Sequence, residues 1–202
     1  GDKLSKKDAY NISDISKVYW LDEFQKNLKK LIDNCNSIYL NKNMHSRLSS
    51  EVETRDERFR KNLIKTYNKP ILESAPIMHV LRSKKSIPEI ELIQKACNIT
   101  ENGLRRILPI IKPGIMEFEI EAELIHEFLI NRSSGFAYQP IIGSGRNSCI
   151  LHYIDNNKQC QSGDLILMDV GATYGNYASD MTRTVPVSGK FTARQRSVYD
   201  LS

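Results

Sequence analysis

The chain has 202 residues, of which 40% are hydrophobic and 26% charged, the composition of an ordinary globular protein with a sizeable core. No apolar run approaches the roughly 20 residues of a membrane span, and the beginning of the chain lacks the apolar core of a signal peptide. The four cysteines are scattered and form no CxxC pair, which argues against a zinc site or a disulfide framework, so we expect a cytoplasmic protein.

The net charge of +5 arises in the first part of the chain. Residues 1–83 contain 16 Lys and Arg against 11 Asp and Glu, whereas residues 84–202 contain 13 of each. A nucleic-acid surface needs clustered basic residues interleaved with aromatic ones, but acids alternate with bases in the basic stretch ETRDERFRK at 53–61. We interpret this stretch as a solvated helix face and expect neither a nucleic-acid nor a membrane partner.

The first 81 residues predict a few alternating helices and strands. Residues 1–16 are polar without periodicity and predict a loose tail, and apolar residues then recur at helical spacing from Trp20 to Cys35. The further elements expected here are a short strand at 37–40, a loop at 41–50, a helix from Val52 to about Tyr67 and an extended segment at 77–81. This order is that of part of an α/β domain.

A hinge at 82–86 is predicted to separate this part from the rest. Ser86 and Glu89 form a capping-box pattern at the start of a long helix, which Pro109 ends or kinks. The elements expected after it are a second helix at 117–131, strands at 136–142 and 149–153 around a GSGRN loop, a hairpin, and a helix capped by Thr192. We therefore predict an α/β (α+β) fold in which residues 84–202 pack helices on one face of a mainly antiparallel sheet.

The hairpin is the most informative stretch of the sequence. From Gly163 to Pro186 two apolar strands flank a tight turn at Gly175-Asn176. Because side chains alternate between the two faces of a sheet, Asp169 and Asp180 are expected on one face, as diagonal neighbours on adjacent strands. The pairs implied by a two-residue turn are Tyr174 with Tyr177, Thr173 with Ala178, Gly171 with Asp180, and Asp169 with Thr182.

Two carboxylates in this arrangement repel each other unless a cation lies between them or one takes a proton. We expect them within about 6 Å of each other, with Met168 and Val170 on the opposite face and room for a ligand beside Gly171. Carboxylates suit hard divalent ions, and a pair that bridges two metal ions is one way to activate water for hydrolysis. The alternative is that both acids lie in solvent at strand ends, but the apolar run that leads into Asp169 favours a partnered acid.

Three strings in the sequence resemble a known family. They are GSGRNSCILHY at 143–153, GDLILMDVGATYGNYASDMTRTVPVSGKFTARQRSVYD at 163–200, and SAPIMHVLRSKKSIPEIELIQKA, which extends the resemblance back to residue 74. Together they resemble the first half of the catalytic domain of Xaa-Pro aminopeptidases (aminopeptidase P), which have the pita-bread metallopeptidase fold. The spacing of the two acids is shared with methionine aminopeptidases and prolidases, whereas LHY and SDMTRTVPVSGKFT favour the aminopeptidase P and prolidase branch.

The resemblance implies a role for each matching residue. Asp169 matches the acid that chelates one metal ion, and Asp180 matches the acid that bridges both. His152, which by its position at the end of an apolar strand would be taken for a structural residue, matches the catalytic histidine that contacts the substrate and steadies the tetrahedral intermediate. Tyr138 matches an aromatic residue at the substrate and metal site, and the strand register puts Thr182 near the metals. The implied cofactors are two divalent ions, commonly manganese, and the implied substrates are peptides with proline in the second position.

The resemblance also implies where the chain belongs in such an enzyme. Residues 1–81 match the C-terminal part of an N-terminal creatinase-type domain, and residues 84–202 match the N-terminal half of the pita-bread domain. The family's other metal ligands, one His and two Glu, and its general acid/base glutamate come from the second half of that domain, which this sequence does not include. We therefore expect an internal fragment that is inactive alone, with an empty or weakly filled metal site, and an intact parent that is a homo-oligomer.

Three functions remain open from the sequence. The parent is expected to be an aminopeptidase that releases the N-terminal residue before proline. The first alternative is a dipeptidase of the prolidase type, and the second is a non-catalytic pita-bread module that binds peptides or proteins. The presence of both Asp169 and Asp180 argues against the non-catalytic module.

Overall fold

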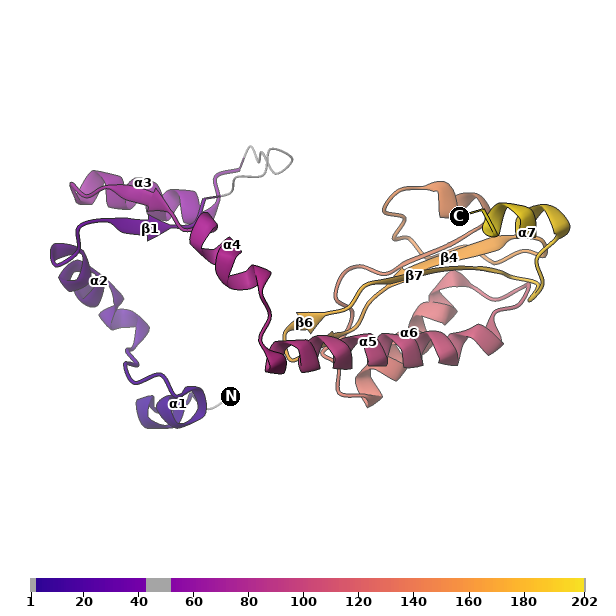
Figure 1. The fold of residues 1–202 in the computed structure, drawn as a ribbon, viewed down its shortest axis with the longest axis horizontal. Helices are drawn as coiled ribbons and strands as arrows, with labels where there is room; N and C mark the ends of the chain where they lie inside the picture. The colour runs from indigo at the N-terminus through magenta and orange to yellow at the C-terminus, as the bar shows by residue number, and fades with distance from the viewer. Residues whose placement is uncertain (1–2, 43–51, 202) are drawn as a thin grey trace. The chain divides into compact units, whose positions relative to one another are not determined.

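The computed structural model describes residues 3–42 and 52–201. The chain divides into two compact units, Gly1–Lys84 and Lys85–Ser202 (Figure 1). Each unit has its own sheets, as predicted, and no sheet of the described residues runs through both. Most of the predicted loop at 41–50 lies outside the described residues. Among the helices of the described residues, none is long and apolar enough to span a membrane.

The first unit combines helices with a two-stranded parallel sheet. Ile38 pairs with Ile71 and Leu40 with Glu73, and the Thr54 side chain caps the third helix by accepting a 3.2 Å hydrogen bond from the Glu57 N–H. The predicted amphipathic helix after Trp20, the strand near 38–40 and the helix before Pro70 are all confirmed. The elements are α1 (Lys6–Ser13), η1 (Leu21–Glu23), α2 (Phe24–Asp33), β1 (Ile38–Leu40), α3 (Arg55–Thr66), β2 (Ile71–Glu73) and α4 (Ala75–Ser83).

Two predictions for this unit were wrong. Residues 6–13 form a helix rather than a loose tail, because Ser5 caps its first turn and Asp14, at φ 55°, closes its last turn with an N–H bond to the Tyr10 carbonyl. The segment at 77–81 belongs to helix α4 rather than to an extended strand. A short apolar run does not distinguish the two, and Pro76 is compatible with the first turn of a helix.

The second unit contains two long helices, a three-stranded sheet and a small hairpin. The capping box at Ser86 and Glu89 is confirmed, since the Glu89 carboxylate accepts hydrogen bonds from the Ser86 N–H at 2.6 Å and from its hydroxyl at 2.8 Å. The elements are α5 (Ile87–Ile107), η3 (Leu108–Ile110), α6 (Glu117–Ile130), β3 (Ile141–Ser144), η4 (Gly145–Cys149), β4 (Leu165–Val170), β5 (Thr173–Tyr174), β6 (Tyr177–Ala178), β7 (Met181–Pro186) and α7 (Ala193–Tyr199).

Helices α5 and α6 cover one face of the antiparallel sheet β3-β4-β7 (Figure 1). Alternate residues of β4 point into this interface, where Ile166, Met168 and Val170 are completely buried. They pack in one cluster with residues of both helices, including Ile107 and Phe128. The predicted arrangement of helices on one face of a mainly antiparallel sheet is confirmed. Asp169 consequently lies on the opposite face of the sheet from the helices.

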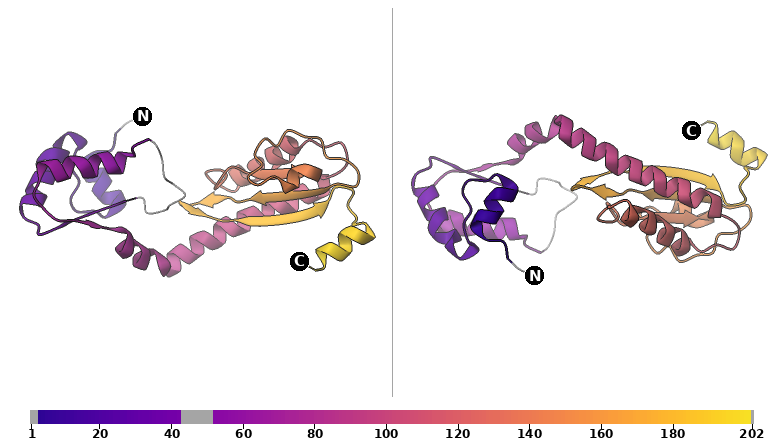
Figure 2. Two further views of the ribbon diagram at one scale, coloured as in Figure 1. Left: turned by 90° about the horizontal axis from the view of Figure 1, so that it is seen from above. Right: turned by 90° about the horizontal axis from the view of Figure 1, so that it is seen from below.

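The predicted register of the hairpin is confirmed, although the ladder between its strands has a gap. Tyr174 pairs with Tyr177, and Asp169 pairs with Thr182. The ladder is interrupted between these pairs, because β4 ends at Val170 and β7 begins at Met181. The expected pair of Gly171 with Asp180 is therefore not part of a strand ladder. In Figure 2 the hairpin β5-β6 runs alongside α5, with which it is in contact.

The strands predicted at 136–142 and 149–153 were largely wrong. Only Ile141–Ser144 form a strand, with one isolated bridge from Phe136 to Ala172. Residues 145–149 form a 3-10 helix, and a turn follows in which the Tyr153 N–H bonds to the Ile150 carbonyl at 3.3 Å. The apolar residues that suggested the second strand do not enter a sheet core, since Ile150 and Leu151 are 52% and 86% exposed.

Candidate active site

One tyrosine hydroxyl contacts both predicted metal-binding acids. The Tyr138 hydroxyl lies 2.6 Å from Asp169 Oδ1 and 3.1 Å from Asp180 Oδ1. Since both oxygens touch the same atom, they lie within about 6 Å of each other, the range of direct charge coupling. The predicted proximity of the two acids on one side of the sheet is thus confirmed. Burial raises the pKa of Tyr138, and the hydrogen bonds to Asp169 and Asp180 raise it further, so its hydroxyl keeps its proton as a donor.

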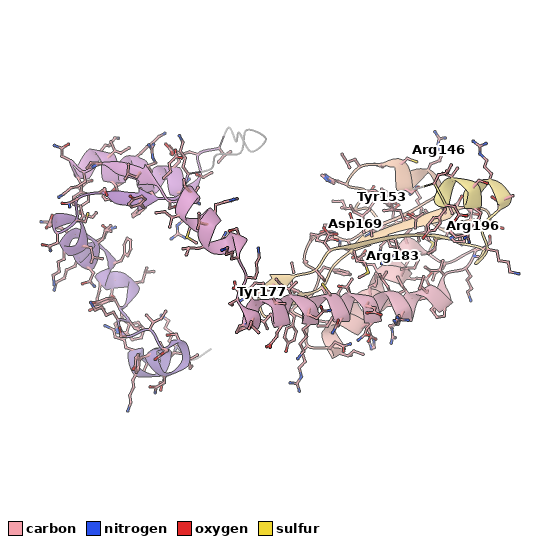
Figure 3. The ribbon with its side chains drawn as sticks, viewed as in Figure 1. Arg146, Tyr153, Asp169, Tyr177, Arg183 and Arg196 are labelled. Atoms are coloured by element: carbon pink, nitrogen blue, oxygen red, sulfur yellow. The ribbon has the colours of Figure 1, made fainter. Side chains whose placement is uncertain are left out.

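A pocket of about 420 Å³ gathers these three residues together with His152. Four predicted residues that are distant in sequence therefore meet at one concave site. Of these four, Figure 3 labels Asp169, which lies on β4. The residues that complete the wall, Gln139, Ile141 and Ile154, were missed from the sequence. No motif marks them, because they line the pocket only through the fold. Two apolar side chains and the tyrosine ring give the pocket an apolar wall beside its acids.

The acids of this pocket have no cationic partner among the described residues, where none of the ion pairs involves Asp169 or Asp180. Two carboxylates and a phenol offer only oxygen atoms, the donors that hard divalent ions prefer. They fit part of a metal site. In the part of the chain that the structure describes, no group of three or more His, Cys, Asp or Glu side chains is arranged to hold a metal ion, so further ligands would have to join these two acids.

His152 reaches the pocket from a turn, where its backbone adopts the left-handed conformation at φ 58°. The next residue anchors this turn in the protein. Tyr153 is 6% exposed and donates a 2.7 Å hydrogen bond to the carboxylate of Glu117, which is completely buried in the first turn of α6. Figure 3 labels Tyr153 on the segment drawn above the sheet.

Glu117 is a buried carboxylate held by donors from three segments. Its oxygens also accept hydrogen bonds from the Ser144 N–H at 2.8 Å, the Ser144 hydroxyl at 2.7 Å and the Lys158 N–H at 3.0 Å. Burial alone would raise the pKa of Glu117, but the bonds from Tyr153, Ser144 and Lys158 outweigh it and lower the pKa below its ordinary value. Among the described residues, hydrogen bonds rather than a salt bridge stabilise this charge.

Asn156 fixes the other end of the same segment. It is buried and has φ 45°, a conformation that asparagine tolerates better than most residues. Its side chain accepts a 3.0 Å bond from the Ile142 N–H and donates to the Pro140 carbonyl at 3.0 Å and to Glu121 Oε2 at 2.8 Å. Side chains rather than a strand ladder therefore hold the backbone around His152, which explains why an apolar run there was mistaken for a strand.

One predicted feature of the site was wrong. Gly171 does not leave open room beside the acids, because a Cβ atom on it would lie 1.9 Å from the Ser179 carbonyl oxygen and 3.2 Å from the Tyr138 ring. Thr182 pairs with Asp169 as predicted. It also lines an open groove of about 850 Å³ between β7 and α7. Its position near bound metal ions stays a prediction.

Residues 91–202 match the model of metallopeptidase family M24. The Xaa-Pro aminopeptidase of Escherichia coli K12 is 33% identical over 189 residues, which are 93% of this chain and 43% of that protein. The Xaa-Pro aminopeptidase of Haemophilus influenzae is also 33% identical, over 100% of this chain and 45% of its own length. This chain thus spans less than half the length of these relatives.

Solved structures agree in fold over the whole chain. Proline aminopeptidase P II from Yersinia pestis superposes with a TM-score of 0.84 at 32% identity, covering 100% of this chain and 47% of that one. A variant of Escherichia coli aminopeptidase P in complex with substrate gives 0.83 at 32% identity, covering 100% and 46%. The resemblance to aminopeptidase P and its pita-bread fold is therefore confirmed. With more than half of its residues matched by the family model, the chain belongs to metallopeptidase family M24.

Proposed function

We propose that this chain is part of a longer metal-dependent aminopeptidase, which releases the N-terminal residue from peptides with proline in the second position. The observation that carries the proposal is the meeting of Asp169, Asp180, Tyr138 and His152 at one pocket. Similarity to proteins named Xaa-Pro aminopeptidase supports the choice of substrate.

Asp169 and Asp180 would hold the metal ions in this proposal. The absence of a cationic partner for either acid among the described residues supports this role. Their oxygen donors suit manganese, and we propose that two manganese ions bind. A divalent ion, when bound, polarises a peptide carbonyl and lowers the pKa of water for attack. We propose that the further ligands come from outside the residues described.

The other pocket residues would bind and orient the peptide. The single hydroxyl proton of Tyr138 lies within hydrogen-bond distance of one oxygen of each acid, so this residue would orient both carboxylates. His152 carries a ring that can donate a hydrogen bond to a peptide carbonyl oxygen in the pocket, and it would hold that oxygen as negative charge develops on it. Ile141 and Ile154 provide apolar surface for substrate side chains and exclude water from them.

The remaining features of the proposal concern the intact protein. Residues 1–81 would be the C-terminal part of a creatinase-type domain, and residues 84–202 the N-terminal half of the pita-bread domain. We propose a homo-oligomer that acts on peptides in the cytoplasm. The four cysteines of the present chain are free thiols, which is consistent with a reducing compartment.

The test compares this 202-residue chain with the longer protein, each with Mn²⁺ and a peptide that begins Xaa-Pro. We expect the longer protein to release the first residue and the chain alone to be inactive, because two carboxylates cannot complete a metal site. Asp180→Asn in the longer protein should abolish release, whereas Asp155→Asn, a change at an exposed acid of the same unit, should not. Activity of the chain alone, or undiminished activity of Asp180→Asn, would contradict the proposal. An Xaa-Pro dipeptide as the only substrate cleaved would identify a prolidase-type dipeptidase instead.

A further inference from the structure

Two buried hydroxyl groups meet directly beside the candidate metal site. Thr100, in the middle of α5, is completely buried, and Ser179, which precedes Asp180, is 5% exposed. Their Oγ atoms are 2.6 Å apart although the residues are 79 positions apart in the chain. Buried polar groups require partners, and this pair connects the long helix to the interruption of the hairpin.

Both hydroxyls bind the same backbone amide. The Ala172 N–H donates to Thr100 Oγ1 at 2.9 Å and to Ser179 Oγ at 3.0 Å. Its neighbour across the hairpin is Ser179, whose own N–H donates to the Ala172 carbonyl at 3.0 Å. In a regular antiparallel pair the Ala172 N–H would return this bond to the Ser179 carbonyl. Two side-chain oxygens take the place of that carbonyl here.

The released Ser179 carbonyl turns toward Gly171. It lies so close that a Cβ atom on Gly171 would be 1.9 Å from its oxygen. This rotation of the peptide between Ser179 and Asp180 coincides with the break in the ladder, since β6 ends at Ala178 and β7 begins at Met181. Asp180 therefore leaves the strand geometry at the residue where its carboxylate comes within 3.1 Å of the Tyr138 hydroxyl.

We propose that Thr100 and Ser179 are positioning residues for Asp180. By satisfying the Ala172 N–H, they allow the Ser179–Asp180 peptide to rotate out of the ladder and to bring the Asp180 carboxylate beside that of Asp169. Because Thr100 belongs to α5, the helix that begins the catalytic unit takes part in shaping the acid pair without touching it. The inference rests on the proposed role of Asp180 as a metal ligand.

The test measures Mn²⁺ affinity by electron paramagnetic resonance of the free ion, in the full-length protein with Thr100→Val, Ser179→Ala and both changes. Each single variant retains one acceptor for the Ala172 N–H and should lose part of the affinity, whereas the double variant retains neither. We expect the double variant to lose at least about tenfold in affinity, as for groups that orient metal ligands, and more than the product of the two single losses. In the metal-free protein, exchange of the Ala172 amide hydrogen should be faster in each single variant than in the wild type, and fastest in the double variant.

Two control variants separate positioning from general destabilisation. Thr100→Ser keeps the hydroxyl and should keep the affinity, and it also provides the comparison with Thr100→Val if the double variant does not fold. Ile99→Val perturbs the buried core of the same helix turn and should lower the melting temperature without changing the affinity. Wild-type affinity in the double variant, or equal affinity in Thr100→Val and Thr100→Ser, would overturn the inference. So would a loss in Ile99→Val as large as that of the double variant.

A further variant distinguishes this inference from the proposed function. Asp180→Asn should lose Mn²⁺ affinity if the acid is a metal ligand. If Asp180→Asn binds Mn²⁺ as the wild type does, the proposed function fails and the positioning role fails with it. If Asp180→Asn loses affinity while the double variant does not, the proposed metal site stands and only the positioning role is wrong.

Discussion

The phenol of Tyr153 donates a 2.7 Å hydrogen bond to Glu117, a carboxylate that is completely buried at the start of α6. Tyr153 directly follows His152, so this bond ties the turn that carries the histidine to a helix of the core. The lowered pKa of Glu117 shows that its bonded donors more than compensate for burial. The residue next to His152 is therefore bonded to a charge that lies outside the pocket.

Replacing Tyr153 with phenylalanine should reduce the stability of the protein at pH 7. The change removes one hydrogen bond to a buried charge, and we expect the free energy of unfolding to fall by about 1–2 kcal/mol in urea denaturation. Tyr177→Phe is a matched control, because its hydroxyl donates at 2.7 Å to Glu89, which is only partly buried. Its loss should be smaller, and equal losses in the two variants would show that the burial of Glu117 is unimportant.

The pH dependence of stability should reveal the same pair. Glu117 has a lower pKa in the folded protein than in the unfolded chain, so its contribution is complete above the ordinary glutamate value and is lost as the pH falls through the folded value. Burial, together with the bond to Glu117, raises the pKa of Tyr153 to about 12. The contribution of the phenol is complete below its ordinary value of about 10 and is lost as the pH rises towards 12. Urea denaturation across these two ranges should show both losses in the wild type, and the alkaline loss should be smaller in Tyr153→Phe. Some alkaline loss should remain in that variant, because the pKa values of Tyr138 and Tyr177 are raised as well.

Removing the hydroxyl of Tyr138 should destabilise the metal-free protein. Tyr138→Phe keeps the ring but leaves the Asp169 and Asp180 carboxylates facing each other without a donor between them. We expect a loss of about 1–2 kcal/mol in urea denaturation with EDTA. The loss should shrink in an Asp169→Asn background, in which one of the two charges is already absent. An effect of the same size in both backgrounds would mean that the hydroxyl does not act through these acids.

Adding a methyl group at Gly171 should disturb the acid pair through the backbone. The Cβ atom of Gly171→Ala would collide with the Ser179 carbonyl oxygen at 1.9 Å, and a backbone atom cannot yield as the end of a flexible side chain can. Overpacking of this kind costs about 1–3 kcal/mol, which thermal unfolding should register as a lower melting temperature. Gly114→Ala should also melt lower but for another reason, because φ 97° strains an alanine there although nothing lies within 4 Å of its added Cβ. If Gly171→Ala melts as the wild type does, the close approach of the Ser179 carbonyl is not a constraint.

Local patterns in the sequence were sufficient for several parts of the structure. The capping box at Ser86 and the register that pairs Asp169 with Thr182 both depend on residues near each other in the chain, so spacing alone identifies them. The alternation along β4 likewise predicted that Met168 and Val170 face the core while Asp169 faces away. These features are decided by backbone geometry over a few residues.

The tertiary structure alone decided the surroundings of the acids. Nothing local to Thr100 or Glu117 indicates that their side chains meet Ser179 and Tyr153 across 79 and 36 positions of sequence. The apolar run before His152 predicted a strand because its hydrophobicity does not reveal that buried side chains, rather than a neighbouring strand, satisfy the backbone there. The room expected beside Gly171 is filled for the same reason: the fold brings a distant carbonyl and a tyrosine ring to it. A sequence pattern reports which face a residue occupies, whereas only the folded chain determines which groups share that face, because hydrogen bonds and packing act between atoms regardless of their separation along the chain.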